Sequence, residues 1–349
     1  MRLSLLHAVP ALALLATACV SIDHNVPAAS PISAGLPERL TLYADANGHL
    51  YPDRWEEQFD RHAIEEQHSL LSAAGRTEEA RRRLRDERTR QLDTVAARLR
   101  DRGRIFILVH GFNNTHAEAR HAFDIVRGRL PLRPSDGVVE FHWDGLSSRD
   151  TPGQMAMWFN AVGYSQVAGT QALRGLIARL PDKHIVIVAH SRGASVTLSA
   201  LSNPSWARGF RRSVEALLGD EFPAPPLPEA TGPIDLLFLA PAIGNPDFWT
   251  ERGRSREACP FRDFPRLRSL HYTVNERDPV LKKHVRGLAS RFNATDLGHR
   301  LAVGQRIAAC YRGRFTMQPH QLSMPRHSFI DYALDGIFPR MVAAAGLTP

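Results

Sequence analysis

The sequence predicts an α/β fold centred on a doubly wound, mostly parallel sheet. Five segments with the pattern of strands carry this prediction. The first, residues 104–109, is a continuous apolar run, and the others occupy residues 138–143, 184–189, 234–240 and 268–274. Segments with helical spacing alternate with the first of them, at residues 115–130, 154–180 and 193–201. Continuous apolar runs are typical of strands buried on both faces of a parallel sheet, and their alternation with helices is typical of doubly wound folds.

The composition agrees with one large globular domain. The chain has 349 residues, of which 43% are hydrophobic, enough for a sizeable core. The formal net charge of +8 comes almost entirely from arginine. Basic residues alternate with acidic ones, as in residues 81–88, and this pattern is typical of a solvated helix face. We therefore expect no nucleic-acid partner.

The N-terminus predicts export. Residues 3–18 form an apolar stretch after a short basic start, and the stretch is too short for a stable membrane span. It ends in Ala-Thr-Ala, and Cys19 follows directly. We interpret residues 1–18 as a signal peptide. Residues 19–37, which are rich in Pro, Ala and Ser, are interpreted as a tether to the domain.

Cys19 leaves two interpretations of the mature N-terminus open. In the first, Cys19 is the lipidated first residue of a lipoprotein anchored in a membrane of the cell envelope. In the second, the protein is periplasmic or secreted and the cysteine is incidental. We favour the first because one of only three cysteines stands at the processing site.

The other two cysteines, Cys259 and Cys310, then remain as an even pair. In the oxidising compartment of an exported protein they predict a disulfide. Two buried thiols are the alternative, because free cysteine is among the most buried residue types.

Residues 38–103 predict a helical extension in front of the sheet. Residues 40–43 have the pattern of a short strand, and two amphipathic helices follow with a break near residues 73–75. The main domain is expected over residues 104–349. Within it, the proline-rich connection of residues 203–232 is too irregular for a strand–helix unit, so we interpret it as an insertion.

A serine turn follows the third predicted strand. The sequence Ala-His-Ser-Arg-Gly at residues 189–193 is a small-x-Ser-x-Gly turn that opens a helix. Such a turn exposes the serine hydroxyl at a sharp corner, where Ala189 and Gly193 are small enough for the crowded backbones. The helix beyond supplies free N–H groups. Ser191 is the predicted nucleophile, and a serine that only caps the helix is the alternative.

The first predicted strand ends in His-Gly-Phe-Asn-Asn at residues 110–114. Acyl transfer needs hydrogen-bond donors aimed at the developing oxyanion, and one of them normally comes from the loop after this strand. We assign this role to the backbone N–H of Phe112 and, after the nucleophile, of Arg192. Gly111 allows the close approach. Asn113 or Asn114 is expected to supply a helix cap, with a contact to a ligand as the alternative.

An orienting acid must follow the nucleophile in the chain. The loop after the strand of residues 268–274 holds Asp278, which is the predicted acid. Glu276 in the same loop is a rival, and Asp247 after the preceding strand is a weaker one. The alternative for Asp278 is a simple turn position before proline.

The base is expected last in the chain, in a loop before the final helix. His327 stands there, at the start of an amphipathic C-terminal segment. His320 and His299 are the competing histidines. His327 is the predicted base because it completes the order Ser, Asp, His.

The motifs at residues 110–114 and 189–193 resemble those of a bacterial family of α/β-hydrolases of poorly defined function. Residues 141–144 and 271–278 resemble later segments of that family, and the likeness extends over about residues 104–335. It implies an α/β-hydrolase fold and an esterase- or lipase-like activity. One departure is Arg192, where relatives commonly have methionine; its charge either favours an anionic substrate or points to solvent. Another is Asp144-Gly145, which replaces the expected proline turn.

Together these residues predict a serine hydrolase that cleaves carboxylic esters of small molecules or lipids at the cell envelope. No cofactor or metal is expected, because the chain has no metal-binding or P-loop motif. A non-catalytic lipoprotein that uses the fold as a binding module is one alternative. A thioesterase or peptidase with the same triad is another. The apolar cluster between the second and third strands is interpreted as a buried helix face, with an acyl pocket or lid as the alternative; it comprises Met155, Met157, Trp158 and Phe159.

Overall fold

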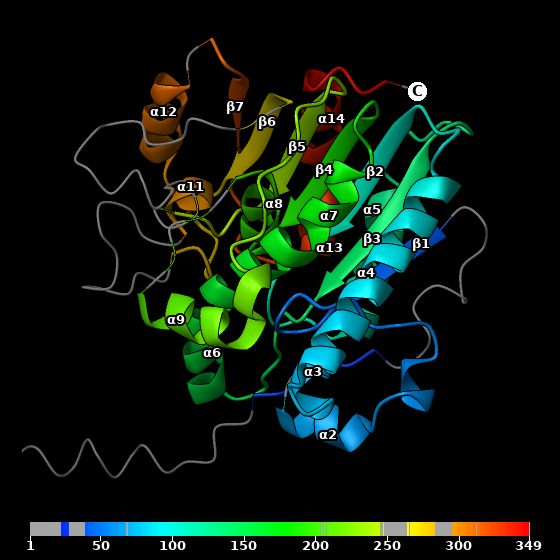
Figure 1. Ribbon diagram of the computed structural model, residues 1–349. Helices are drawn as coiled ribbons and strands as arrows, with labels where there is room; N and C mark the ends of the chain where they lie inside the picture. Colours follow the sequence, from blue (N-terminus) through cyan, green and yellow to red (C-terminus); the bar gives the residue numbers. More distant parts are fainter. Residues whose placement is uncertain are drawn as a thin grey trace, which may run out of the picture.

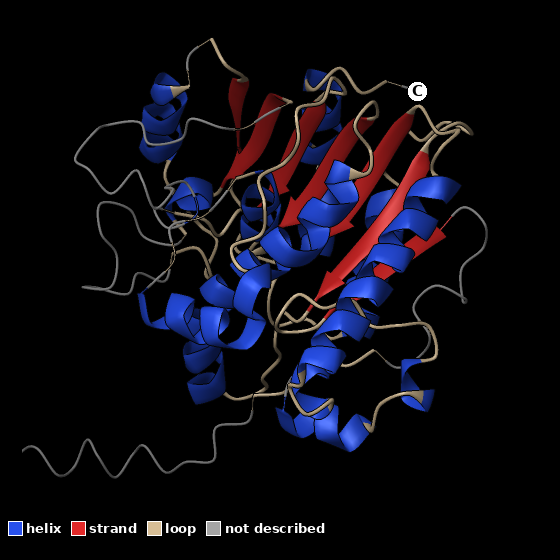
Figure 2. Cartoon of the chain, in the orientation of Figure 1, coloured by secondary structure: helices blue, strands red, loops and turns tan. Residues whose placement is uncertain are grey.

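The protein is represented by a computed structural model that describes residues 22–27, 39–67, 69–202, 204, 206, 208–244, 247, 264, 266–282, 295–311 and 313–348. Its centre is one seven-stranded sheet in the order β1-β3-β2-β4-β5-β6-β7, with every neighbouring pair parallel. Helices cover both faces of the sheet (Figure 2). The predicted α/β-hydrolase fold, a doubly wound parallel sheet, is confirmed.

The five predicted strands are all present in the sheet. They are β2 (Arg104–Val109), β3 (Gly137–Trp143), β4 (His184–His190), β5 (Ile234–Leu239) and β6 (Leu267–Val274). β2, β3, β4 and β5 are buried along almost their whole length, as their apolar sequences predict.

The seventh strand, β7 (Thr316–Gln321), is not predicted by the sequence. It pairs with β6 only and is mostly exposed or half-buried, since it lies at the edge of the sheet. Its sequence includes Pro319 and few apolar residues, which is tolerated on an edge strand but hides the strand from a search for apolar runs.

The extension before residue 104 is part of the same sheet. β1 (Arg39–Ala44) pairs with β3 along its length and forms the other edge. The long helix α4 (Glu78–Arg98) packs its apolar side chains into the core that lines one face of the sheet. The predicted boundary at residue 104 therefore does not separate two structural units, because β1 belongs to the sheet and the second half of α4 packs in the core on one of its faces.

Between β1 and α4 the described residues form three short helical pieces. They are η2 (Trp55–Glu57), α2 (Arg61–Gln67) and α3 (Leu70–Ala73), and a small apolar cluster joins them to the start of α4. The expected break lies at Gly75 and Arg76, which both adopt positive φ and end the α3 turn before α4 begins.

Two apolar layers sandwich the sheet because side chains of each strand alternate between its faces. On β2, Ile105 and Ile107 belong to one layer, and Phe106 and Leu108 to the other. The first layer is covered by α4, η3 (Ala168–Leu173), α7 (Arg174–Ala178), α8 (Gly193–Leu201), α11 (Asp296–His299) and α12 (Leu301–Cys310). The second is covered by α5 (His116–Arg127), α13 (Phe329–Leu334) and α14 (Ile337–Ala344), which lie behind the sheet in Figure 1.

The connection of residues 203–232 is more regular than expected. It contains α9 (Arg208–Leu218) and η4 (Gly219–Glu221), next to α6 (Thr151–Val167) in Figure 1. The side chains of Val214, Leu218 and Phe222 are buried against Val167 of α6 and Trp206. The helix was missed because the prolines that follow it dominate the composition of the segment.

The predicted tether also needs correction. Residues 22–27 lie against the domain, where Asp23 forms an isolated antiparallel bridge with Ser147. The signal peptide, Cys19 and Cys259 lie outside the described residues. Within the described ranges, no helix is both long enough and apolar enough to cross a membrane.

Candidate active site

The nucleophile turn is held at the carboxyl end of β4. Ser191 has φ 52°, a left-handed conformation that costs a non-glycine residue free energy. Its N–H donates to the carbonyl of Leu239 at 3.0 Å, and its own carbonyl accepts from the N–H of Ala242 at 3.1 Å. These two bonds to the end of β5 hold the strained corner that points a serine side chain away from the sheet.

Two glycines let the neighbouring backbone approach this turn. A Cβ added at Gly193 would lie 2.5 Å from the carbonyl oxygen of His110, and one added at Gly111 would lie 2.8 Å from Cβ of Ser191. Real Cβ atoms do not come this close, so both positions require glycine. The expected close approach of the loop after β2 is therefore present in the structure.

The three predicted catalytic side chains meet at this edge. Nε2 of His327 lies 3.0 Å from Oγ of Ser191, and Nδ1 of His327 lies 2.7 Å from Oδ2 of Asp278. Asp278 follows β6 and is fully buried, whereas the side chain of His327 keeps a 15% exposed fraction. A tautomer with the proton on Nδ1 satisfies both bonds, since Nε2 then accepts from the serine hydroxyl.

Asp278 is held as a carboxylate. Burial opposes its ionisation, but hydrogen bonds from His327, from the N–H of Leu281 and from the hydroxyl of Tyr332 lower its pKa below the usual value. The N–H of Val280 donates to the same carboxylate at 2.9 Å. Asp278 is therefore set to accept from the imidazole and to stabilise a positive charge on it.

Two residues that hold the three catalytic candidates in place were not predicted. Tyr332 donates to Oδ2 of Asp278 at 2.8 Å, and Asn275 donates to the hydroxyl of Tyr332 at 2.8 Å. Asn275 also donates to the carbonyl of Met324 at 2.8 Å, so it ties the loop of Asp278 to the loop of His327. Both lie within segments that the sequence analysis singled out, but only the tertiary contacts show what they bind.

A third positioning residue is His190, directly before the nucleophile. Its Nε2–H donates to the carbonyl of His327 at 2.6 Å, and its ring stacks on Phe329 with centroids 5.0 Å apart. Burial, reinforced by the nearby His327, lowers the pKa of His190 to about 3. A neutral His190 therefore holds the backbone of the proposed base.

The rival acids and bases lie elsewhere. Glu276 is exposed, and Asp247 binds Arg192. His320 on β7 lies 3.2 Å from His271 on β6, and His299 is buried in α11. None of the four has a described contact with Ser191.

The loop after β2 carries Phe112 next to the nucleophile turn. Nδ2 of Asn114 donates to the carbonyl of Phe112 at 2.9 Å. Asn113, at φ 57°, donates its N–H to the carbonyl of Gly145 and accepts at Oδ1 from the N–H of Ser148. The two asparagines thus fasten the loops after β2 and β3.

The expected helix cap needs correction. α5 is capped by Thr115, which accepts from the N–H of Glu118, and Glu118 in turn accepts from the N–H of Thr115. This reciprocal capping box satisfies two N–H groups of the first turn without an asparagine.

His110 also holds the loop after β2 in place. Its Nδ1–H donates to the carbonyl of Gly111 at 2.7 Å, and Nε2 accepts from the N–H of Trp143 at 3.2 Å. Burial lowers the pKa of His110 to about 4. The ring therefore stays neutral at neutral pH and joins the ends of β2 and β3.

The side chain of Arg192 does not face substrate or solvent. It is buried and forms a bidentate ion pair with Asp247, at 3.1 and 2.9 Å. It also donates to the carbonyl of Ala242 at 2.6 Å and to the hydroxyls of Ser165 and Ser195. The expectations that the charge of Arg192 favours an anionic substrate or points to solvent are both corrected, because Asp247 neutralises this charge inside the protein.

Other predicted features are only partly described. Met157 is buried in α6, as expected for a helix face, but nothing is described of the side chains of Met155, Trp158 and Phe159. Cys310 at the end of α12 is disulfide-bonded. Cys259 lies outside the described residues, so its pairing with Cys310 stays a prediction.

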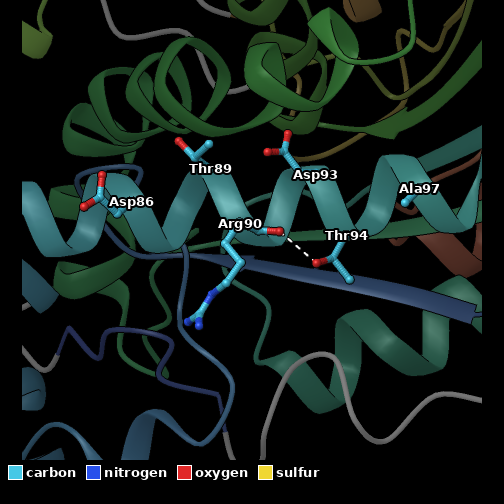
Figure 3. Close-up of a pocket in the computed structure, with 6 residues that line it drawn as sticks. All are labelled: Asp86, Thr89, Arg90, Asp93, Thr94 and Ala97. Atoms are coloured by element: carbon cyan, nitrogen blue, oxygen red, sulfur yellow. Dashed lines mark hydrogen bonds between the residues drawn. The ribbon is translucent and has the colours of Figure 1, made fainter.

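One hollow lies along α4, away from the three catalytic candidates. It is lined by Asp86, Thr89, Arg90, Asp93, Thr94 and Ala97 (Figure 3). All six residues come from one helix, so the hollow does not enclose a ligand as binding pockets do. Among the described residues, no group of three His, Cys, Asp or Glu side chains is arranged to hold a metal ion.

Residues 86–218 match the model of a family described as "Alpha/beta hydrolase of unknown function (DUF900)". This range includes β2, β3 and β4 and therefore both motifs on which the family resemblance rests. The match confirms the resemblance of this part of the chain to α/β-hydrolases. No curated protein matches the chain.

Two solved structures resemble the chain weakly. Esterase 2 of Thermogutta terrifontis, phosphonylated by cyclosarin, is 11% identical with a TM-score of 0.33, over 71% of this chain and 82% of that one. An uncharacterized protein from Pseudomonas aeruginosa is 12% identical with a TM-score of 0.30, over 78% of this chain and 50% of that one. At these scores neither likeness assigns an activity to this chain.

Proposed function

We propose that this protein is a serine hydrolase that cleaves carboxylic esters through an acyl-enzyme formed on Ser191. One observation carries the proposal: His327 lies within hydrogen-bond distance of Ser191 and Asp278 at the same time, at 3.0 and 2.7 Å. A serine hydroxyl, an imidazole and a buried carboxylate in this order form the arrangement that activates a serine nucleophile.

In the first step, Oγ of Ser191 bonds to the carbonyl carbon of the ester while Nε2 of His327 takes the hydroxyl proton. Asp278 holds the imidazole through Nδ1 and stabilises its positive charge. The backbone N–H groups of Phe112 and Arg192 donate to the oxygen that becomes negative. His327 then gives its proton to the leaving alcohol as the ester bond breaks.

In the second step, water attacks the acyl-enzyme. His327 takes a proton from the water and returns it to Oγ of Ser191 as the carboxylic acid leaves. Each proton thus passes through one nitrogen atom, and no cofactor or metal is required by the proposal.

The proposal includes export and a place at the cell envelope. Residues 1–18 are the proposed signal peptide and Cys19 the proposed lipid anchor, and a periplasmic or secreted form is the alternative. The proposed substrate is an ester of a small molecule or lipid, and no nucleic-acid partner is proposed. A thioester or peptide substrate would use the same residues and differ in its leaving group.

A fluorophosphonate probe tests the proposal. The wild-type protein is expected to be labelled covalently, and Ser191→Ala is expected to lose labelling completely. Ser199→Ala is the matched control, because this buried serine of α8 has a hydroxyl without a hydrogen-bond partner among the described residues. Equal labelling of wild type and Ser191→Ala would refute the hydrolase and favour a non-catalytic binding module.

The leaving group is tested with one acyl chain presented as an oxygen ester, a thioester and an amide. A serine esterase is expected to have its highest kcat/KM for the oxygen ester. A higher kcat/KM for the thioester would instead indicate a thioesterase with the same triad, and a higher kcat/KM for the amide would indicate a peptidase.

A further inference from the structure

Residues 22–27, called the N-terminal strap below, are bound to the domain by their backbone. The N–H of Asp23 donates to the carbonyl of Ser147 at 2.8 Å, and the N–H of Ser147 donates back at the same distance. Arg61 of α2 donates to the carbonyl of Pro27 at 3.2 Å. The strap is therefore held at both ends.

The middle of the strap binds a buried carboxylate. The N–H of Asn25 donates to Oδ1 of Asp144 at 3.0 Å, and Nδ1 of His24 contacts the other oxygen, Oδ2. Asp144 is 3% exposed, and its remaining described partner is the N–H of Leu146. The strap thus supplies two of the three described partners of this carboxylate, and hydrogen bonds to a charged group are stronger than those between neutral groups. Binding of the strap is thus part of the folded state.

The strap binds the loops that form the proposed oxyanion site. Nδ2 of Asn25 donates to the carbonyl of Asn114 at 2.8 Å, and the side chain of Asn114 holds the carbonyl of Phe112 at 2.9 Å. Gly145, next to Asp144, packs so closely that an added Cβ would lie 3.2 Å from Cα of Phe112. In Figure 1 the dark blue strap lies beyond the ends of the strand arrows, between α6 and α3.

This position limits how far the domain can move from its proposed anchor. Three residue steps separate Cys19 from Ile22, which span at most about 11 Å. A free tether from Cys19 to β1 would instead reach about 70 Å at full extension. A lipid on Cys19 therefore keeps the strap, and with it the loops after β2 and β3, next to the membrane surface.

We propose that the N-terminal strap holds the active site against the membrane, and that the substrate is an acyl ester carried by a lipid of that membrane. The inference rests on the proposed hydrolase function and on lipidation of Cys19. In the reaction, the acyl carbon of the lipid bonds to Oγ of Ser191 and its alcohol leaves with the serine proton. Water then releases the free fatty acid and restores Ser191.

A spacer experiment tests this inference with the full lipidated protein in vesicles of phosphatidylethanolamine and phosphatidylglycerol. An insert of 20 Gly and Ser residues directly after Cys19 keeps the anchor but lets the domain leave the surface. Hydrolysis of a fluorescent acyl lipid in the same vesicles is expected to fall at least tenfold. Hydrolysis of the soluble ester p-nitrophenyl butyrate is expected to stay within twofold of the native protein.

The matched control carries the same insert after Gly313, in the exposed turn between α12 and β7. It leaves the distance from anchor to strap unchanged, so both activities are expected to equal those of the native protein. Equal lipid hydrolysis by the native protein and the Cys19 insert would overturn the inference, as would an N-terminus without lipid by mass spectrometry.

The same assay separates this inference from the proposed function. A native protein that cleaves the soluble ester but no vesicle lipid overturns the inference and keeps the hydrolase. A native protein that cleaves neither ester and resembles Ser191→Ala overturns both.

Discussion

At the scale of single residues, Arg192 combines two functions that the sequence cannot separate. Its backbone N–H is the proposed oxyanion donor, and its side chain is fixed by Asp247 behind the nucleophile turn. Asp247 also accepts from the N–H of Gly244 at 3.1 Å, so the ion pair ties the turn after β4 to the loop after β5.

Removal of one partner of this ion pair is expected to destabilise the protein strongly. Asp247→Asn leaves a buried guanidinium without its counter-charge, which costs roughly 3–5 kcal/mol in comparable pairs. Replacement of both residues, in Arg192→Met with Asp247→Leu, is expected to cost less than Asp247→Asn alone. Urea unfolding of the wild type and the two variants measures these differences, and a double variant less stable than Asp247→Asn would contradict the prediction.

Substitutions at Asp278 and at its partner Tyr332 are expected to lower kcat to different extents. Asp278→Asn is expected to lower kcat for a soluble ester by about 10⁴-fold, because the imidazole loses the partner that fixes its tautomer. Tyr332→Phe removes only one donor to the same carboxylate, so its kcat is expected to fall far less. Steady-state kinetics measures both variants. A Tyr332→Phe enzyme as slow as Asp278→Asn would contradict a supporting role for the tyrosine.

At the scale of elements, the strap and the loops after β2 and β3 act as one unit. Asn25 is buried and connects Asp144, Asn114 and, through its carbonyl, Nε2 of His116 at 2.9 Å. The position of the loop that carries Phe112 is therefore fixed in part by a segment almost ninety residues earlier in the chain.

Truncation of Asn25 is expected to loosen this unit. Asn25→Ala leaves the carbonyl of Asn114 without its donor, at a cost of roughly 1–3 kcal/mol, and is expected to lower kcat more than it changes KM. Asp23→Ala is the matched control, because Asp23 binds Ser147 only through backbone atoms in the described contacts and is itself exposed to solvent. If both variants behave alike in unfolding and kinetics, the side chain of Asn25 has no such role.

At the scale of the whole molecule, buried neutral histidines make folding sensitive to acid. Burial lowers the pKa of His110 to about 4 and those of His116 and His190 to about 3, and the pKa of His142 lies well below its usual value. The unfolded chain takes up protons on these groups below about pH 6.5, and the folded protein does not.

The free energy of unfolding is therefore expected to fall as pH drops below about 6.5. Each such histidine contributes at most about 1.4 kcal/mol per pH unit until its folded pKa is reached. Asp278 and Asp235, whose pKa values are lowered, lose their contributions only at more acidic pH, below about 4. Urea unfolding at pH 7.5, 6 and 5 measures the slope, and equal stability at these three values would contradict the prediction.

Local patterns made most of the fold and the three candidate side chains predictable. β2 to β6 are buried along almost their whole length and are rich in apolar residues, and the crowded turn at Ser191 needs small residues at fixed positions. β7 and α9 lack such a local pattern and were not predicted. β7 is an edge strand that need not be apolar, and α9 precedes a proline-rich stretch that obscures it.

By itself, the sequence determined the parallel sheet, the nucleophile turn and the order Ser191, Asp278, His327, because each depends on residues close together in the chain. Only the tertiary structure showed that Asp278 rather than Glu276 contacts His327, that the side chain of Arg192 is buried against Asp247, and that residues 22–27 bind the domain. These outcomes depend on contacts between residues far apart in the sequence, where burial and the need to pair each buried charge select one partner among several.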